Sequence, residues 1–159
     1  MNFDNMLVRE LSSADAESIE NLFLSVFTRD PWNDDWSDRD QLHSYMSDIS
    51  GNHNSLSLGL FENEELVGIS LGSVIHWFSG TEYYIREFCV STDLQHKGYG
   101  SFFLKRFSCV LARNRLRQLF CQRIRIRQRI SSIARTDFRY SKKAFSFTRI
   151  SASGKKWKR

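Results

Sequence analysis

Long apolar runs are absent from this sequence, and so are the cysteine spacings of metal sites and disulfide frameworks. No run of about 18 apolar residues occurs, so we expect neither a membrane-spanning helix nor a membrane partner. The N-terminal stretch MNFDNMLVREL lacks the basic-then-apolar plan of a signal peptide. The three cysteines, Cys89, Cys109 and Cys121, are an odd number without metal-ligand spacing. They predict reduced thiols in a cytoplasmic protein that binds no metal.

Acidic residues are almost missing from the C-terminal third, and basic residues are scarce before it. Residues 1–104 hold five of the 23 Lys and Arg but 17 of the 18 Asp and Glu. Residues 105–159 hold the other 18 basic residues and one acid, Asp137, so the net charge of +5 conceals two oppositely charged parts. Such asymmetry is typical of a tail that binds nucleic acid or an acidic surface, and this stays open as an alternative function.

The length of 159 residues suits one domain, and its apolar periodicity predicts eight elements in the order βααβββαβ. Ser12 or Ser13 is expected to cap the first helix, and Ser37 or Asp38 the second. Strands are expected at 5–11, 54–62, 66–78, 80–91 and 117–121, and helices at 12–27, 39–50 and 99–114.

The stretch EFCVSTDLQHKGYGSFFLKRF, residues 87–107, joins a strand to a helix through a glycine-rich turn. The N–H groups of a first helical turn have no partner within the helix, and the helix dipole adds partial positive charge there. Gly98 and Gly100 permit backbone conformations that a Cβ would block, and Lys97 adds a positive charge. The turn is therefore suited to hold phosphate oxygens. The alternative is a tight turn in which glycine serves geometry alone.

The pattern Gln-x-x-Gly-x-Gly at Gln95, Gly98 and Gly100 follows a strand ending in Phe88-Cys89-Val90 and precedes an amphipathic helix. In this setting it resembles the GNAT superfamily of acetyl-CoA-dependent N-acetyltransferases, and the preceding βααβββ order is similar too. The resemblance covers residues 5 to about 120. It implies an α/β (α+β) fold, with a mixed, mostly antiparallel sheet flanked by helices. It also implies that the sheet splays between its fourth and fifth strands, where acetyl-CoA would enter.

The resemblance further implies how acetyl-CoA and an acceptor amine would be held. Its pantetheine arm would pair with the backbone of Phe88, Cys89 and Val90, like an added strand. Its pyrophosphate would lie on the main-chain N–H groups of one turn, formed by Gln95, His96, Lys97, Gly98, Tyr99, Gly100 and Ser101.

Glu87 is the candidate general base for moving the acetyl group to a primary amine of a small molecule. It lies two residues from Cys89 and hence on the same face of the strand. The resemblance implies that the amine attacks the thioester directly, so a base must take its proton. The alternative is a solvated carboxylate or a partner of Arg86, which we weigh equally.

The acceptor side is expected in the loop at residues 28–36 and the helix that follows. Its aspartates would attract a cationic amine, and its tryptophans would form the walls of the acceptor site. The residues are Asp30, Asp34, Asp35, Trp32 and Trp36. The alternative is an ordinary acidic loop with aromatic anchors. The stretch PWNDDWS resembles small bacterial GNAT proteins that are often likened to aminoglycoside 6′-N-acetyltransferases. This resemblance loosely supports a polyamine-like or aminoglycoside-like acceptor. A homodimer stays open.

Residues 121–159, the tail, do not resemble the GNAT family as written, but their coding sequence read in a neighbouring frame does. GNAT proteins similar to this one continue with a pattern like TDxDTPAxxFYxKxGF. One permitted codon set for Cys121–Phe138, shifted by a single T inserted after the Phe120 codon TTT, encodes LPTDTDTPAYQFYRKNGF. The first two bases of most codons are fixed by the residues, so chance is a poor explanation. The sequence therefore indicates a GNAT core at residues 1–120 and an out-of-frame tail at 121–159.

If the tail is translated out of frame, its basic charge has no function of its own, and no nucleic-acid partner is needed to explain it. The rival is a true basic tail for RNA or acidic membranes. Its aromatic residues are only loosely placed for base stacking; they are Phe138, Tyr140, Phe145, Phe147 and Trp157. In the family, a Tyr of the missing helix serves as acid to the leaving thiolate, so we expect this chain to be impaired.

Overall fold

The computed structural model describes residue 3 and residues 5–78, 80–113 and 118–121. Its element order confirms the predicted βααβββαβ series, with two short 3-10 turns added. The tail from residue 122 onward, with its proposed change of frame, lies outside the described residues. The elements are β1 (Met6–Glu10), η1 (Ser13–Asp15), α1 (Ala16–Phe27), α2 (Arg39–Ser50), β2 (Ser55–Glu62), β3 (Glu65–Trp77), β4 (Gly80–Val90), η2 (Thr92–Leu94), α3 (Tyr99–Arg113) and β5 (Gln118–Cys121).

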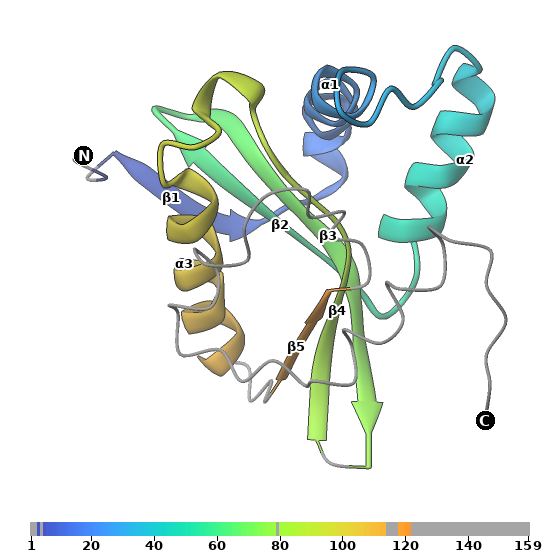
Figure 1. The fold of residues 1–159 in the computed structure, drawn as a ribbon. Helices are drawn as coiled ribbons and strands as arrows, with labels where there is room; N and C mark the ends of the chain where they lie inside the picture. Colours follow the sequence, from blue (N-terminus) through green and yellow to red (C-terminus); the bar gives the residue numbers. More distant parts are fainter. Residues whose placement is uncertain (1–2, 4, 79, 114–117, 122–159) are drawn as a thin grey trace, which may run out of the picture.

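The described strands form one sheet in the order β1-β2-β3-β4-β5, with helices on both faces (Figure 1). The first four strands pair antiparallel and β5 runs parallel to β4, which confirms the mixed, mostly antiparallel sheet. Helices α1 and α2 cover one face and α3 covers the other. None of the helices in the described ranges is long and apolar enough to cross a membrane.

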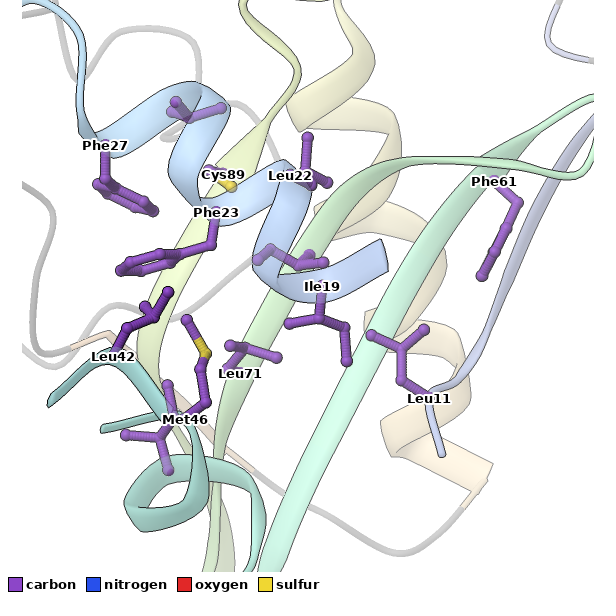
Figure 2. Close-up of a cluster of buried hydrophobic side chains, with 13 residues drawn as sticks. Leu11, Ile19, Leu22, Phe23, Phe27, Leu42, Met46, Phe61, Leu71 and Cys89 are labelled. Atoms are coloured by element: carbon purple, nitrogen blue, oxygen red, sulfur yellow. The ribbon is translucent and has the colours of Figure 1, made fainter. Parts of the chain in front are cut away.

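Each face of the sheet has its own apolar cluster. Figure 2 shows the first, in which Phe23 of α1 and Met46 of α2 pack over Leu71 and Cys89 of the sheet. In the second, Phe103 and Leu104 of α3 pack against the strands, and the two residues from β4 are Tyr83 and Ile85. The apolar residues of α1 and α2 therefore form one buried stripe per helix, as their helical spacing predicts, and in the described side chains of α3 Phe103 and Leu104 are buried in the same way.

A β-bulge in β4 changes which of its residues face which helices. Gly72 of β3 pairs with Ile85, but the neighbouring Leu71 pairs with Glu87, so Arg86 is an extra residue in β4. Before the bulge the odd-numbered residues of β4 face α3. After it, Glu87 lies across from Leu71 and so faces α1 and α2.

Gly72 makes this bulge possible because the backbone of β4 approaches it closely. A Cβ added at Gly72 would lie 2.1 Å from the carbonyl oxygen of Tyr84 and 3.0 Å from the Cα of Ile85. Both contacts are to backbone atoms, which cannot rotate away as a side chain can. Only glycine fits at this position without moving the strand.

Strand β4 is paired with β5 over only part of its length. The pairing runs from Glu82 and Gln118 to Ile85 and Cys121. Among the described residues, β4 from Arg86 to Val90 therefore has no strand on that edge. The predicted separation of the fourth and fifth strands falls on this part of β4.

The first helix begins later than the serine caps predict. Residues Ser13–Asp15 form a 3-10 turn, and α1 starts at Ala16. The cause is Asp15, whose carboxylate accepts a hydrogen bond from the Ser12 N–H at 2.8 Å and from Arg9 of β1 at 2.6 Å. These bonds hold the pKa of Asp15 well below its usual range. The cap of α2 is Asp38, as one of the two predicted alternatives, and its side chain accepts from the Gln41 N–H at 3.0 Å.

Replacing Gly72 with Ala is expected to destabilise the fold strongly, because the new Cβ meets backbone rather than side-chain atoms. We expect the free energy of unfolding to fall by roughly 2–4 kcal/mol, as for other strained core substitutions. Urea denaturation followed by circular dichroism measures it.

Gly68→Ala in the same strand is the matched control, since its nearest new contacts are 3.3 Å and include a side-chain atom. We expect it to cost less than about 1 kcal/mol. Equal losses in the two variants would show that the close approach at the bulge has no special role.

Candidate active site

An open cleft of about 570 Å³ lies beside the unpaired end of β4. Its walls come from the end of α1, the loop after it, the end of β4 and the turn before α3. The lining residues are Val26, Phe27, Asp30, Pro31, Trp32, Phe88, Cys89, Val90, Gln95, His96 and Gly100. The structure thus brings six of the residues expected to bind acetyl-CoA, and two expected to bind an acceptor, to one place.

The turn between β4 and α3 has the backbone geometry that its glycines predict. His96 and Gly98 have positive φ angles of 61° and 83°. The Gln95 side chain donates to the Val90 carbonyl at 3.2 Å and ties the turn to β4. The Phe102 N–H bonds the Gly98 carbonyl at 2.9 Å, which closes the first turn of α3. The preceding first-turn N–H groups then have no carbonyl within the helix to bond.

The side chains of Tyr99 and Lys97 point away from the cleft or do not line it, unlike those of Gln95 and His96. The Tyr99 hydroxyl donates to Glu62 of β2 at 2.7 Å, and the ring packs edge-on against Phe3. The hydrogen bond to the Glu62 carboxylate raises the pKa of Tyr99. Its side chain is therefore turned toward the sheet, and only its main chain can face a ligand. Lys97 is exposed and, like Ser101, does not line the cleft.

Glu87 is buried, with only 3% of its surface exposed. Its Oε1 accepts a hydrogen bond from the hydroxyl of Tyr45 on α2. The structure therefore does not show the solvated carboxylate that was one alternative for Glu87. Glu87 faces α2 from the same face of β4 as Cys89, as the sequence predicts, although the bulge and not simple alternation puts it there.

Cys89 lines the cleft but is poorly suited to act as a nucleophile. Burial, and then the negative charge of Glu87, raise the pKa of its thiol. Since the thiolate is the reactive form, a thiol held protonated cannot readily take up an acyl group. The residue's contribution at this site is its backbone and its apolar surface.

The loop at residues 28–36, where the acceptor is expected, is anchored by aromatic contacts. Some of its acidic residues line the cleft and others do not. Trp32 packs against Phe27 with ring centroids 5.4 Å apart, and Asp30 accepts from the Asn33 amide at 2.6 Å. Both Asp30 and Trp32 line the cleft, whereas Asp34, Asp35 and Trp36 do not. Asp35 accepts instead from the Ser37 N–H at 3.0 Å, and its hydrogen bonds to Ser37 lower its pKa.

Trp36 and Tyr45 form an aromatic wall beside Glu87. Their rings stack with centroids 5.1 Å apart and an interplanar angle of 29°. The indole Nε1 of Trp36 is the one buried side-chain nitrogen or oxygen in the described ranges that lacks a hydrogen-bond partner. Trp36 thus lies in the expected region, but next to the carboxylate rather than in the cleft.

Sequence reasoning missed Tyr45, Val26, Phe27 and Pro31 as site residues. The helical spacing of Leu42, Tyr45, Met46 and Ile49 predicts that Tyr45 lies on the apolar face of α2, which is where it lies. The available signal was its hydroxyl, the only titratable group on that face. In the described part of the chain, no group of three or more His, Cys, Asp and Glu is placed to hold a metal ion.

Residues 16–123, more than half of the chain, match the model of the Acetyltransferase (GNAT) family. The chain belongs to the GNAT acetyltransferase family. By family it is an acyltransferase, which confirms the resemblance carried by Gln95, Gly98 and Gly100. No curated protein sequence matches the chain.

Solved GNAT structures share the fold at low sequence identity. An aminoglycoside acetyltransferase, meta-AAC0020, from an uncultured soil metagenomic sample in complex with sisomicin, has a TM-score of 0.59 at 16% identity, covering 99% of this chain and 94% of that one. A GNAT acetyltransferase from Staphylococcus aureus has a TM-score of 0.61 at 14% identity, covering 79% and 92%. AAC(6′)-Iy with a bisubstrate analogue has a TM-score of 0.56 at 12% identity, covering 77% and 82%.

Two glycine substitutions should separate the roles of backbone and cleft in this GNAT turn. Gly98→Ala is strained because of the positive φ of 83°, and we expect it to cost about 1–2 kcal/mol of stability. Gly100→Ala fits the protein, since its Cβ would meet Phe88 and Val90 at 3.9 Å. Gly100 lines the cleft, so the added methyl is expected to weaken acetyl-CoA binding about tenfold, or about 1.4 kcal/mol, without lowering the melting temperature.

Thermal unfolding and calorimetric titration with acetyl-CoA measure the two effects. Unchanged affinity in Gly100→Ala would show that this part of the turn does not approach the ligand.

Proposed function

We propose that this chain transfers an acetyl group from acetyl-CoA to a primary amine of a small molecule. The observation that carries the proposal is the cleft beside β4, where a strand edge that no described strand pairs, the turn at the start of α3 and an acidic, aromatic loop meet. The family gives the reaction class, and these features supply its parts.

The cofactor side would use main-chain groups. The strand edge at Phe88, Cys89 and Val90 offers N–H and C=O groups to the amides of the pantetheine arm. The N–H groups of residues 98–101, at the positive end of α3, would be donors to the pyrophosphate, and the Lys97 side chain would add charge. The N–H groups of Gln95 and Lys97 are already bonded, to the carbonyls of Thr92 and Leu94. The fit is favoured by Gly98, whose positive φ turns the chain, and by Gly100, which leaves space in the cleft.

The transfer step would be direct. Cys89 is held protonated, so an acyl-enzyme on this residue is disfavoured. The amine would attack the thioester carbon, and Glu87 would accept the proton that the nitrogen loses. The carbon–sulfur bond breaks, and the leaving thiolate takes a proton from solvent or from an acid outside the described residues.

The acceptor is proposed to be a small cationic amine. Asp30 and Trp32 line the cleft, so a carboxylate and an indole face the amine's approach. Asp34, Asp35 and Trp36 would act farther out, through charge and through the stack on Tyr45. The named ligand of one structural relative, sisomicin, is an aminoglycoside, and that of AAC(6′)-Iy contains acetylneamine, which supports an acceptor of that kind.

The full chain is expected to bind acetyl-CoA, and Glu87→Gln should leave this binding intact while lowering acetyl transfer. The substitution keeps the shape of the side chain but removes its basicity, so the rate should fall by about 10²–10⁴-fold. Calorimetry measures binding, and a thiol-release assay against polyamines and aminoglycosides measures transfer.

No binding of acetyl-CoA at millimolar concentration would overturn the proposed function. If the chain is instead a nucleic-acid-binding protein, it should bind RNA with an affinity that falls steeply as salt rises.

We also propose that residues 1–120 are the GNAT core and that 121–159 are translated out of frame. The site residues named above all precede Phe120, so the frame change would leave cofactor binding largely in place. It would remove the helix that carries the thiolate acid in the family. Sequencing the coding DNA across the Phe120 codon tests the frame directly.

Inserting one T after the Phe120 codon is expected to raise acetyl transfer by about 10²–10⁴-fold, the usual contribution of a positioned acid. Acetyl-CoA affinity should change much less. The measurement is turnover of the same amine panel by the two proteins. Equal turnover would show that the present tail is a working part of the enzyme.

A further inference from the structure

Glu87 presents a problem for its proposed role, because it is almost sealed from solvent. Only 3% of its surface is exposed, and it does not line the cleft. Leu71 of β3 lies across from it, and Cys89 shares its face of β4. A base in such a position needs another group to carry the proton from the amine.

Tyr45 is placed to be that group. Its hydroxyl contacts Glu87 Oε1 directly, and its side chain is only half-buried. Its ring stacks on Trp36 at 5.1 Å and lies 6.0 Å from Phe23, so the phenol is held between the acceptor loop and α1. Tyr45 therefore connects the buried carboxylate to Trp36 of the 28–36 loop, whose residues Asp30 and Trp32 line the cleft, although the Tyr45 and Trp36 side chains do not line it themselves.

We propose that Tyr45 is a proton relay between the acceptor amine and Glu87. This assignment rests on the proposed function, and it adds a residue on α2 to a site whose cleft is lined from α1, β4, α3 and the loops between them.

The relay moves two protons without leaving charge on the phenol. As the amine nitrogen bonds to the acyl carbon, one of its N–H bonds breaks and that proton goes to Tyr45 Oη. The Tyr45 O–H bond breaks at the same time, and its proton goes to Glu87 Oε1. The carbon–sulfur electron pair leaves with the thiolate. Glu87 returns its proton to solvent by the reverse path after the amide product departs.

The titratable groups that the structure describes near this pair come from β4. Cys89 of β4 is close, but its thiol is held protonated. Glu82 and Tyr84 lie farther along the same face of β4, beyond the bulge. The neighbours described from β3 and α1 are apolar: Ile69, Leu71, Phe23 and Phe27. Tyr45 is the titratable group whose hydroxyl the structure places in hydrogen-bond contact with Glu87.

The first test is Tyr45→Phe, made in the full chain and in its version with one T inserted after the Phe120 codon; the substitution keeps the ring stack and removes only the hydroxyl. We expect kcat to fall by about 10²–10⁴-fold, with little change in the KM for the amine or in acetyl-CoA affinity. Tyr45→Phe combined with Glu87→Gln should be no slower than either single variant, because both act on one proton path. Ser44→Ala, which removes one exposed hydroxyl from the same helix, is the matched control and should keep wild-type rates.

A second measurement does not depend on turnover. The C–O stretching band of Tyr45 in infrared spectra, identified by its loss in Tyr45→Phe, should shift in Glu87→Gln because the acceptor changes from carboxylate to amide. An unshifted band, or wild-type kcat in Tyr45→Phe, would overturn the relay.

The two proposals fail in different ways. If the wild-type chain neither binds acetyl-CoA nor transfers acetyl, the proposed function fails, and with it the relay. If the wild type transfers acetyl and Tyr45→Phe does so equally well, the relay alone fails. A lowered melting temperature in Tyr45→Phe with unchanged kcat would show a purely structural hydroxyl, which also contradicts it.

Discussion

The candidate site depends on the bulge at Arg86, because this one extra residue decides which way β4 presents its carboxylate. With regular alternation, Glu87 would face α3 together with Tyr83 and Ile85, where the second apolar cluster packs. The bulge turns it toward α2 and into contact with Tyr45. The bulge in turn depends on Gly72, since a side chain there would collide with the Tyr84 carbonyl.

The same strand serves two purposes along its length. Up to Ile85 it is a paired core strand, with β5 on its outer edge. From Arg86 to Val90 its outer edge is not paired to any described strand, and its main chain lines the way into the cleft. The packing of its side chains fixes the position of this strand. Its open edge can therefore hold the amides of a ligand in a fixed place, as an added strand would be held.

The elements could be predicted from the sequence because their signals are local. Helical spacing in α1, α2 and α3, glycine at Gly98 and Gly100, and the cap at Asp38 each act within a few residues. These signals place the turn and the strand end correctly, and the family match confirms the fold they imply.

The finer site could not be read in the same way, because its determinants are contacts between distant segments. Tyr45 and Glu87 are 42 residues apart, and helical periodicity alone places Tyr45 in the core. The bulge arises from how two strands pair, which no single strand reveals. Tyr99 sits in the predicted turn, yet its side chain bonds Glu62 of β2 instead of facing the cleft.

The acidic and basic parts of the sequence can be compared with the position of the candidate site. The groups that would hold acetyl-CoA and move the amine's proton lie between Asp30 and Ser101, in the acidic part of the sequence. The acids there differ in what they contact: Asp15 ties β1 to the start of α1, Asp30 lines the cleft, and Glu87 bonds Tyr45. Most of the basic residues after residue 104 lie outside the described residues. Of the 18 basic residues after residue 104, 13 lie in 121–159, where the proposed change of frame would account for them. The other five, from Lys105 to Arg117, precede Phe120, so the GNAT part of the chain itself becomes basic before the proposed change of frame.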